Sequence, residues 1–320
     1  MKPVIMSLMA GTAMLVTTPA FAQTQCAQFE LVGNGARVAY QPFETSPTIE
    51  TFDLRIRRLA DGISGVRFLL VDTTPQMNGP QIGTAGPSVY DISWLEDNTR
   101  RMLVVGNEQP QPTTGAKVQF AERAGVQLTR FRLSVPAGQQ APARVHRENL
   151  TVRYQCLDSQ GRQIGATQEQ PASVELSLTV PRYVAAYIGS AGQTRGTINF
   201  GDVGSASATL NRAINITALS TLPFAIKFES ENGGLLKRRA TEAQGIVYAM
   251  NYAGVAVSPG DTLQCPMTPA PMGIGNQFEV GLNRSSITSL PAGNYRDTVT
   301  LTFTPRDGVA SANCAIRREN

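Results

Sequence analysis

The sequence predicts an all-β protein built of two tandem antiparallel β-sandwiches. Apolar and polar residues alternate over short segments, with Gly, Pro, Asn and Asp between them, and this pattern is typical of half-buried strands joined by turns. No run of apolar residues has helical spacing. The 320 residues are enough for two domains of ordinary size, each with its own core.

The boundary between the two domains is expected at Pro181. Residues 174–180, VELSLTV, alternate between Val or Leu and polar side chains, as in a strand with one buried face. Proline lacks the N–H that a central ladder needs, so the strand stops there. A second apolar segment, Tyr183–Ile188, follows almost at once. We therefore predict one sandwich over residues 23–180 and another over residues 182–320.

Short alternating segments and two long loops make up most of the first sandwich. The predicted strands are Cys26–Val32, Arg37–Pro42, Thr51–Arg57, Val66–Asp72, Arg101–Val105, Ala116–Ala121, Val126–Val135 and Leu150–Cys156. The loops are Thr73–Pro87 and Gly106–Gly115. Loops of this length are uncommon in a compact domain unless they carry function or are mobile.

The first loop contains Met77 and Ile82 and leads to Tyr90 and Trp94. In one interpretation, the aromatic residues belong to the core and the loop is a surface insertion, since isolated exposed apolar residues are normal. In the other, the four residues form a contact surface.

The second half repeats the style of the first. Its predicted strands are Tyr183–Ile188, Thr197–Val203, Ala208–Ala218, Phe224–Phe228, Ile246–Val257, Gln277–Leu282 and Asp297–Thr304. The turn Asn232-Gly233-Gly234 predicts a hairpin. The sequence VPAG at 135–138 precedes the strand Leu150–Cys156, and LPAG at 290–293 precedes the strand Asp297–Thr304. Both halves are therefore expected to share an architecture near their ends.

The two halves differ in the segments C-terminal to those strands. The first has a polar loop, Leu157–Pro171, and then its own apolar strand at 174–180. The second ends in RDGVASANCAIRREN, whose best alternating face is Ala310, Ala312, Cys314 and Ile316. These mostly small side chains bury little apolar area, and burial contributes about 25 cal/mol per Å². An immunoglobulin-like sandwich without its final strand exposes a hydrophobic groove and unpaired backbone, which a strand from another chain can cover.

The first 22 residues are predicted to be a signal peptide. Lys2 precedes an apolar run from Val4 to Val16, and Ala20-Phe21-Ala22 has the small-x-small pattern of a cleavage site. The alternative, a membrane anchor, is disfavoured by the short apolar run and by Pro19. We expect a mature start at Gln23 and export from the cytoplasm.

Export places the four cysteines in an oxidising compartment, where they are expected to pair. Of the three possible connectivities, Cys26 with Cys156 and Cys265 with Cys314 is preferred, because each pair then closes within one domain. The alternative of a metal site or a reactive thiol lacks close spacing and has only His146 for support.

No motif for catalysis or nucleic-acid binding stands out. The formal charge is +4, and the basic residues are scattered apart from short clusters such as Lys237-Arg238-Arg239, so nucleic acid is not an expected partner. His146 lies in a polar segment and is expected to be a loop or edge residue rather than a general base. The sequence predicts no enzyme, no cofactor and no metal site.

Two segments resemble a known family. SLPAGNYRDTVTLTFTP at 289–305, with INFGDV at 198–203, resembles the spore coat U domain family, which includes subunits of archaic, Csu-type chaperone-usher pili of Gram-negative bacteria. The resemblance is clear over residues 183–305 and weaker over residues 26–180. It implies that a periplasmic chaperone lends the chain a strand, that an outer-membrane usher exports it, and that the next pilin subunit donates the completing strand.

The mature chain has only three residues before Cys26, so it is expected to accept a strand and to donate none. With a self-completed first domain, this is the layout of a tip adhesin in such a family. Alternation within the strands assigns six residues to the donor-strand groove. They are Phe224, Ile226, Phe228, Val299, Leu301 and Phe303.

The leading hypothesis is a fimbrial tip subunit at the cell surface, which attaches bacteria to an abiotic surface or a host receptor and so supports biofilm formation. Met77, Ile82, Tyr90 and Trp94 are the candidate contact residues, since the resemblance suggests hydrophobic loop tips. The alternatives are a non-adhesive minor pilin subunit and a secreted monomeric binding module, for example one that binds glycans, with both domains complete.

Overall fold

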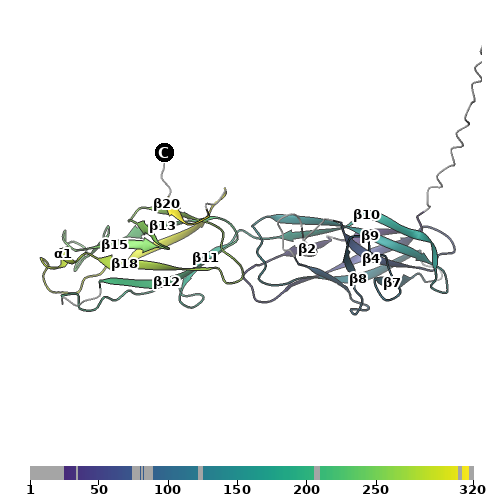
Figure 1. The fold of residues 1–320 in the computed structure, drawn as a ribbon, viewed down its shortest axis with the longest axis horizontal. Helices are drawn as coiled ribbons and strands as arrows, with labels where there is room; N and C mark the ends of the chain where they lie inside the picture. Colours follow the sequence, from purple (N-terminus) through teal and green to yellow (C-terminus); the bar gives the residue numbers. More distant parts are fainter. Residues whose placement is uncertain are drawn as a thin grey trace, which may run out of the picture.

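The computed structural model describes residues 25–33, 35–73, 80, 82, 89–121, 125–204, 210–308 and 312–316. The all-β prediction is confirmed: strands dominate, and α1 (Arg284–Ile287) is the one helix in these ranges. Two sandwiches lie end to end along the long axis (Figure 1). Within the described ranges, no helix is long and apolar enough to cross a membrane. The predicted signal peptide lies outside them.

The first sandwich packs a four-stranded sheet, in the order β1-β3-β8-β5, against a sheet in the order β2-β10-β9-β4-β6, in which β7 also pairs with β4. The strands are β1 (Ala27–Val32), β2 (Ala36–Ala39), β3 (Thr48–Arg58), β4 (Gly65–Asp72), β5 (Asp91–Trp94), β6 (Leu103–Val105), β7 (Ala116–Gln119), β8 (Val126–Val135), β9 (Val145–Leu157) and β10 (Gln163–Thr179). Apolar residues alternate inward along these strands, as β8 shows with buried Phe131, Leu133 and Val135.

The second sandwich packs a sheet in the order β11-β12-β18-β15-β14, with β16 also on β15, against one in the order β19-β13-β17-β20. The strands are β11 (Val184–Ile188), β12 (Asn211–Ser220), β13 (Phe224–Ser230), β14 (Leu235–Leu236), β15 (Ile246–Tyr252), β16 (Val255–Val257), β17 (Thr262–Cys265), β18 (Ile274–Leu282), β19 (Val299–Pro305) and β20 (Ala315–Ile316).

Three sequence predictions about elements were wrong. β10 begins at Gln163, so much of the expected polar loop 157–171 is strand, with register shifts between Ile164 and Gln168 and again before Val174. The segment Thr197–Val203 has no strand assignment. The turn at Asn232 does not close a hairpin, because β14 pairs with β15 in the opposite sheet rather than with β13.

The two hydrophobic cores differ in how well they are covered. In the first core, 34 described hydrophobic residues are buried and two more are only partly buried against them. In the second, 15 are buried and 17 are partly buried. A close-packed core is the norm for a folded domain. The many partly buried residues around the second core therefore indicate that one side of this core is not covered by another element.

Hydrogen bonds fix the joint between the sandwiches. Thr221 binds the linker between the sandwiches. Its hydroxyl donates to the Pro181 carbonyl (2.7 Å) and accepts from the Tyr183 N–H (2.9 Å). Its carbonyl accepts from the N–H of Ala143 in the first sandwich (2.8 Å). The rings of Phe43 and Tyr183 also meet across the joint, with centroids 5.9 Å apart.

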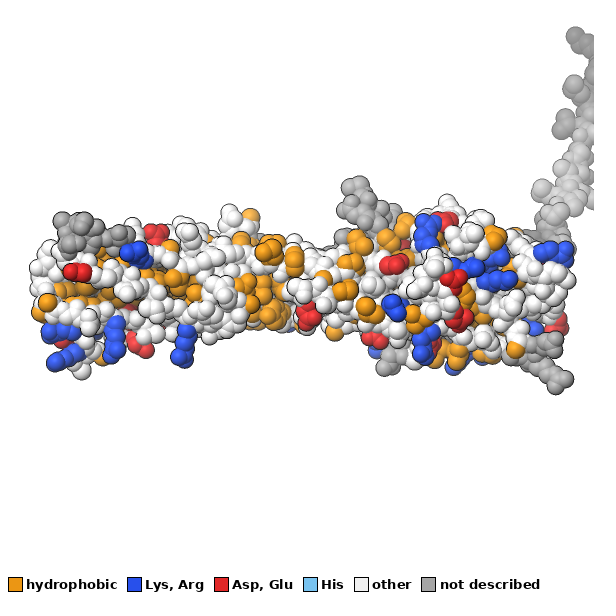
Figure 2. Space-filling view, turned by 90° about the horizontal axis from the view of Figure 1, so that it is seen from below, with side chains coloured by type: hydrophobic (Ala, Val, Ile, Leu, Met, Phe, Trp, Pro, Cys, Tyr) orange, Lys and Arg blue, Asp and Glu red, His pale blue; other side chains and the backbone are white. Residues whose placement is uncertain are grey.

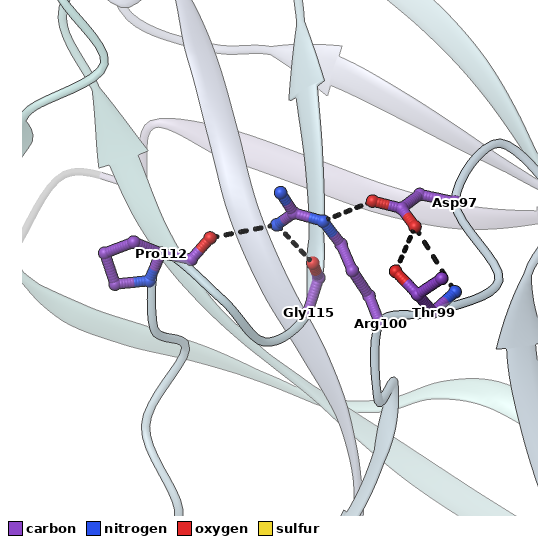
Figure 3. Close-up of polar contacts among 5 residues, drawn as sticks. All are labelled: Asp97, Thr99, Arg100, Pro112 and Gly115. Carbon is purple, nitrogen blue, oxygen red and sulfur yellow. Dashed lines mark hydrogen bonds and ion pairs between the residues drawn. The ribbon is translucent and has the colours of Figure 1, made fainter.

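The predicted loop Gly106–Gly115 is held down by two arginines. Arg100 donates to the carbonyls of Pro112 (3.1 Å) and Gly115 (3.3 Å), and Asp97 fixes its guanidinium through a bond of 2.8 Å (Figure 3). Arg153, buried on β9, donates to the carbonyls of Gly106 and Glu108. This loop is therefore an ordered cover over the outer face of its sheet.

Candidate functional site

The first sandwich supplies its own closing strand. The C-terminal half of β10 lies between two partners, pairing antiparallel with β9 and parallel with β2. Val174, Leu176 and Leu178 are completely buried, and Val180 beyond the strand is 2% exposed. Burying four such side chains contributes roughly 6–12 kcal/mol, which is comparable with the whole net stability of an ordinary domain.

The second sandwich has an unpaired edge at the corresponding strand. β19 pairs with β13 on one side, from Val299 opposite Ser230 to Pro305 opposite Phe224. Within the described ranges, no strand pairs with its other side. Val299, Leu301 and Phe303 are half-buried, and the threonines between them are exposed. The edge thus combines unused backbone hydrogen-bonding groups with an apolar face that is only partly covered.

Across from this edge runs the segment Thr197–Val203, which follows β11 as β2 follows β1. Ile198, Phe200 and Val203 are half-buried against the second core. No backbone–backbone hydrogen bond between described residues joins residues 194–204 to a strand. The apolar side chains that predicted a strand here do face the core. The segment is not assigned as a strand because its backbone forms no ladder of hydrogen bonds with a neighbouring strand.

The C-terminal tail does not occupy the space beside β19 in its described part. Ala315 and Ile316 form β20, which pairs with β17 at the opposite edge of the sheet. The structure joins Cys265 of β17 to Cys314, next to β20, and joins Cys26 to Cys156. Each disulfide therefore closes within one sandwich, in the pairing preferred from the sequence.

A cavity of about 1330 Å³ lies between the two unpaired backbones. It exceeds the roughly 300–1,000 Å³ of ordinary small-molecule pockets. A band of hydrophobic side chains is exposed along this sandwich, the left-hand lobe of Figure 2. The apolar residues that line the cavity include Val184, Ala186, Ile188, Ile198, Phe200, Val203, Ile214, Ile216, Leu236, Ile246, Phe278, Val280, Leu282, Val299, Leu301 and Phe303.

The six residues predicted for the groove fall into two groups. Val299, Leu301 and Phe303 line the cavity. Phe224, Ile226 and Phe228 lie on the neighbouring strand β13, where they are almost completely buried and are not part of the cavity wall. Sequence reasoning missed the floor on β18 and the wall at 197–203, although the alternation in both segments marked an apolar face.

The far end of the cavity carries an internally satisfied carboxylate. Asp297 accepts from the hydroxyls of Tyr248 (2.5 Å) and Ser230 (2.6 Å) and from the N–H groups of Asn232 and Thr298. Burial, followed by the bond to Asp297, raises the pKa of Tyr248 well above its usual value, so its hydroxyl keeps the proton that it donates. This cluster fixes the start of β19.

The predicted contact residues of the first sandwich are buried where they are described. Ile82, Tyr90 and Trp94 are 0%, 2% and 6% exposed. The Trp94 indole donates to the Thr129 hydroxyl (2.6 Å), and the Tyr90 hydroxyl donates to Asp72 (3.2 Å). Met77 lies outside the described residues. The three aromatic and aliphatic side chains are therefore core residues rather than an exposed surface.

His146 is also buried rather than on a polar edge, at 2% exposed. One ring nitrogen contacts the Pro142 carbonyl (2.9 Å), and the other accepts from Arg144 (3.3 Å). In the ranges that the structure describes, no group of three or more His, Cys, Asp or Glu residues is placed to hold a metal ion. What the cavity offers chemically is backbone donors and acceptors on two sides and apolar contact beneath.

Comparisons with known proteins give only distant likenesses. No protein-family model matches the chain, and no curated protein sequence matches it. The solved structures that resemble it include the CupB6 tip adhesin from Pseudomonas aeruginosa (15% identity, TM-score 0.44, 89% of this chain and 94% of that one).

Two further structures are chaperone-bound. One is the CsuC–CsuE chaperone–tip adhesion subunit complex of archaic chaperone-usher Csu pili of Acinetobacter baumannii (14% identity, TM-score 0.38, covering 86% and 99%). The other is a chaperone–tip adhesin complex of CFA/I fimbriae biogenesis (12% identity, TM-score 0.40, covering 88% and 93%). At this level of likeness, the function has to be judged from the chain's own geometry.

Proposed function

We propose that the chain is a tip subunit of a chaperone-usher surface fibre, and that its second sandwich is completed by a β-strand from a partner. The observation that carries the proposal is the cavity between β19 and residues 197–203, at the place that β10 fills in the first sandwich. Two unpaired backbones about 23 Å long, at ~3.3 Å per residue along the seven residues of β19, fit a strand better than a compact ligand.

Under this proposal, residues 182–320 anchor the chain in the fibre and residues 23–180 project from it as the adhesive domain. The first sandwich needs no partner strand because β10 closes it. A periplasmic chaperone occupies the cavity before assembly, and a strand of the next pilin subunit replaces it at an outer-membrane usher. The adhesive target is an abiotic surface or a host receptor, and the chain takes no cofactor.

Expression of residues 23–320 tests the central step. The chain alone is expected to self-associate and to bind a hydrophobic dye such as anilinonaphthalene sulfonate, because an uncovered apolar groove promotes both. A synthetic peptide of residues 172–180, the closing strand of the first sandwich, should displace the dye. A peptide with serine at positions 174, 176 and 178 is the control and should not.

A soluble monomer that binds no dye would refute the proposal and favour the secreted binding module with two complete domains. A strand-accepting chain whose loss leaves both fibres and attachment unchanged in the producing bacterium would also contradict it. Fibres that persist without attachment support the adhesin, whereas fibres that shorten while attachment per fibre is kept indicate a non-adhesive minor subunit.

A further inference from the structure

The strand pairs β4–β9 and β13–β19 occupy corresponding places in the two sandwiches, and both are antiparallel, so they can be superposed. In the first, β4 and β9 place Leu70 opposite Val152. In the second, β13 and β19 place Phe228 opposite Leu301. When the pair Leu70–Val152 is superposed on the pair Phe228–Leu301, HRENL at 146–150 aligns with YRDTV at 295–299. In this superposition, Arg296 takes the position of Arg147.

Arg147 has a defined partner on the closing strand. Its guanidinium donates to the Glu175 carboxylate at 2.8 Å. Glu175 is an outward-facing residue of β10 between Val174 and Leu176, whose side chains point into the core. In the completed sandwich, the strand that fills the gap thus presents a carboxylate to the arginine beside it.

Arg296 has no such partner within the described ranges. It is exposed, it lines the cavity, and no ion pair involves it. Its backbone neighbour Lys237, to which it is joined by two backbone bonds of 3.0 Å, is another cation. The adjacent carboxylate of Asp297 accepts hydrogen bonds from the hydroxyls of Ser230 and Tyr248 rather than pairing with Arg296. An unneutralised positive charge therefore borders the path of the missing strand.

We propose that the strand that fills the cavity carries an Asp or Glu at the position equivalent to Glu175, where it pairs with Arg296. The occupant is then a segment with an apolar, acidic, apolar sequence, running antiparallel to β19 as β10 runs antiparallel to β9. This inference rests on the proposed function and adds the chemistry by which a partner strand is chosen and held in register.

The chain itself provides the test strand. A flexible Gly/Ser linker of about 15 residues spans roughly 21 Å and is appended after Asn320, followed by a copy of residues 172–180. The linker crosses from the β20 edge to the free edge of β19, about 14 Å at ~4.8 Å per strand. Three versions carry Glu, Gln or Lys at the position of Glu175. Urea unfolding of each reports how strongly the tethered strand stabilises the second sandwich.

We expect the Glu version to insert two- to fivefold more favourably than the Gln version, the usual range for an exposed ion pair, and the Lys version to insert least well. The differences should vanish near 1 M salt, where the screening length is about 3 Å. In the Arg296→Glu chain the order should reverse. Arg57→Glu, which changes an exposed arginine of the first sandwich, should leave the order unchanged.

Equal unfolding midpoints for the three versions at low salt, each above that of a linker ending in the serine-substituted segment, would overturn the inference and leave the proposed function intact. An order that persists in the Arg296→Glu chain would also overturn it. If none of the three versions stabilises the chain beyond that serine control, the proposed function fails instead, because the cavity then does not accept a strand.

Discussion

Comparing Leu301→Ala with Leu176→Ala tests whether Leu301 lies on an open cavity wall, since Leu176 lies in a closed core. Leu301 is half-buried on β19, whereas Leu176, at the closing strand of the first sandwich, is 0% exposed. Full burial of a leucine contributes about 1.5–3 kcal/mol, so half of it in the free chain amounts to about 1 kcal/mol. Leu176→Ala removes a fully packed side chain and should cost about 2–5 kcal/mol.

Under the proposed function, the exposed remainder of the Leu301 side chain becomes covered when a strand enters the cavity. Leu301→Ala should therefore also weaken binding of the peptide of residues 172–180 by about 1 kcal/mol, which is roughly fivefold in Kd. Leu176→Ala should leave that Kd unchanged. Peptide binding is measured by fluorescence anisotropy. Urea unfolding is followed by far-UV circular dichroism for both sandwiches, and for the first sandwich also through Trp94, the one tryptophan of the chain.

An equal stability cost for Leu301→Ala and Leu176→Ala in the free chain, with peptide binding unchanged, would refute this prediction. That result would mean that the side chain is already fully packed, and that nothing further covers it when a strand is offered.

Three other perturbations probe separate parts of the structure. Replacing Cys265 and Cys314 together by serine opens a crosslink spanning 49 residues and should cost roughly 4 kcal/mol of unfolding free energy in the chain-entropy model, while peptide affinity stays the same because the tail lies at the opposite edge; lost affinity would contradict this placement. Burial lowers the pKa of His146, so unfolding free energy should fall as pH drops below about 6.5, where the unfolded chain takes up the proton first, and His146→Gln should remove that component from a pH series of urea midpoints. Arg100→Met removes the bonds to Pro112 and Gly115 and should speed limited proteolysis within residues 106–114, with Arg57→Met as the matched control; equal cleavage rates would count against Arg100 as the clamp.

Alternation in the sequence predicted apolar faces well and hydrogen-bond partners poorly. Residues 197–203 have the pattern of a strand and an apolar face turned to the core, yet the structure gives them no ladder. A period of two reports which side chains point inward, but not whether a second backbone lies alongside. The same limit explains Phe224, Ile226 and Phe228, whose alternation is genuine but faces a closed part of the core.

Other elements were missed because local alternation of apolar and polar residues does not mark them. The first half of β10 is polar on both faces, and its ladder is interrupted by register shifts, so no period of two is visible. Gly233 and Gly234 adopt the positive φ that such a turn needs, but turn chemistry does not specify which sheet receives the next strand. Tyr90 and Trp94 were placed correctly only in the interpretation that made them core residues.

The joint at Thr221 has a mechanical consequence. Contacts of only a few residues join the two sandwiches: the linker, the Ala143 N–H and the ring of Phe43. β19 runs toward this joint, since Arg306, just beyond the strand, donates its N–H to the Pro223 carbonyl beside Thr221. In the proposed fibre, a pulling force on the first sandwich would be transmitted through this joint along the long axis of the molecule. A partner strand lying along β19 would then be loaded in shear, with its backbone bonds resisting together instead of being peeled apart in turn.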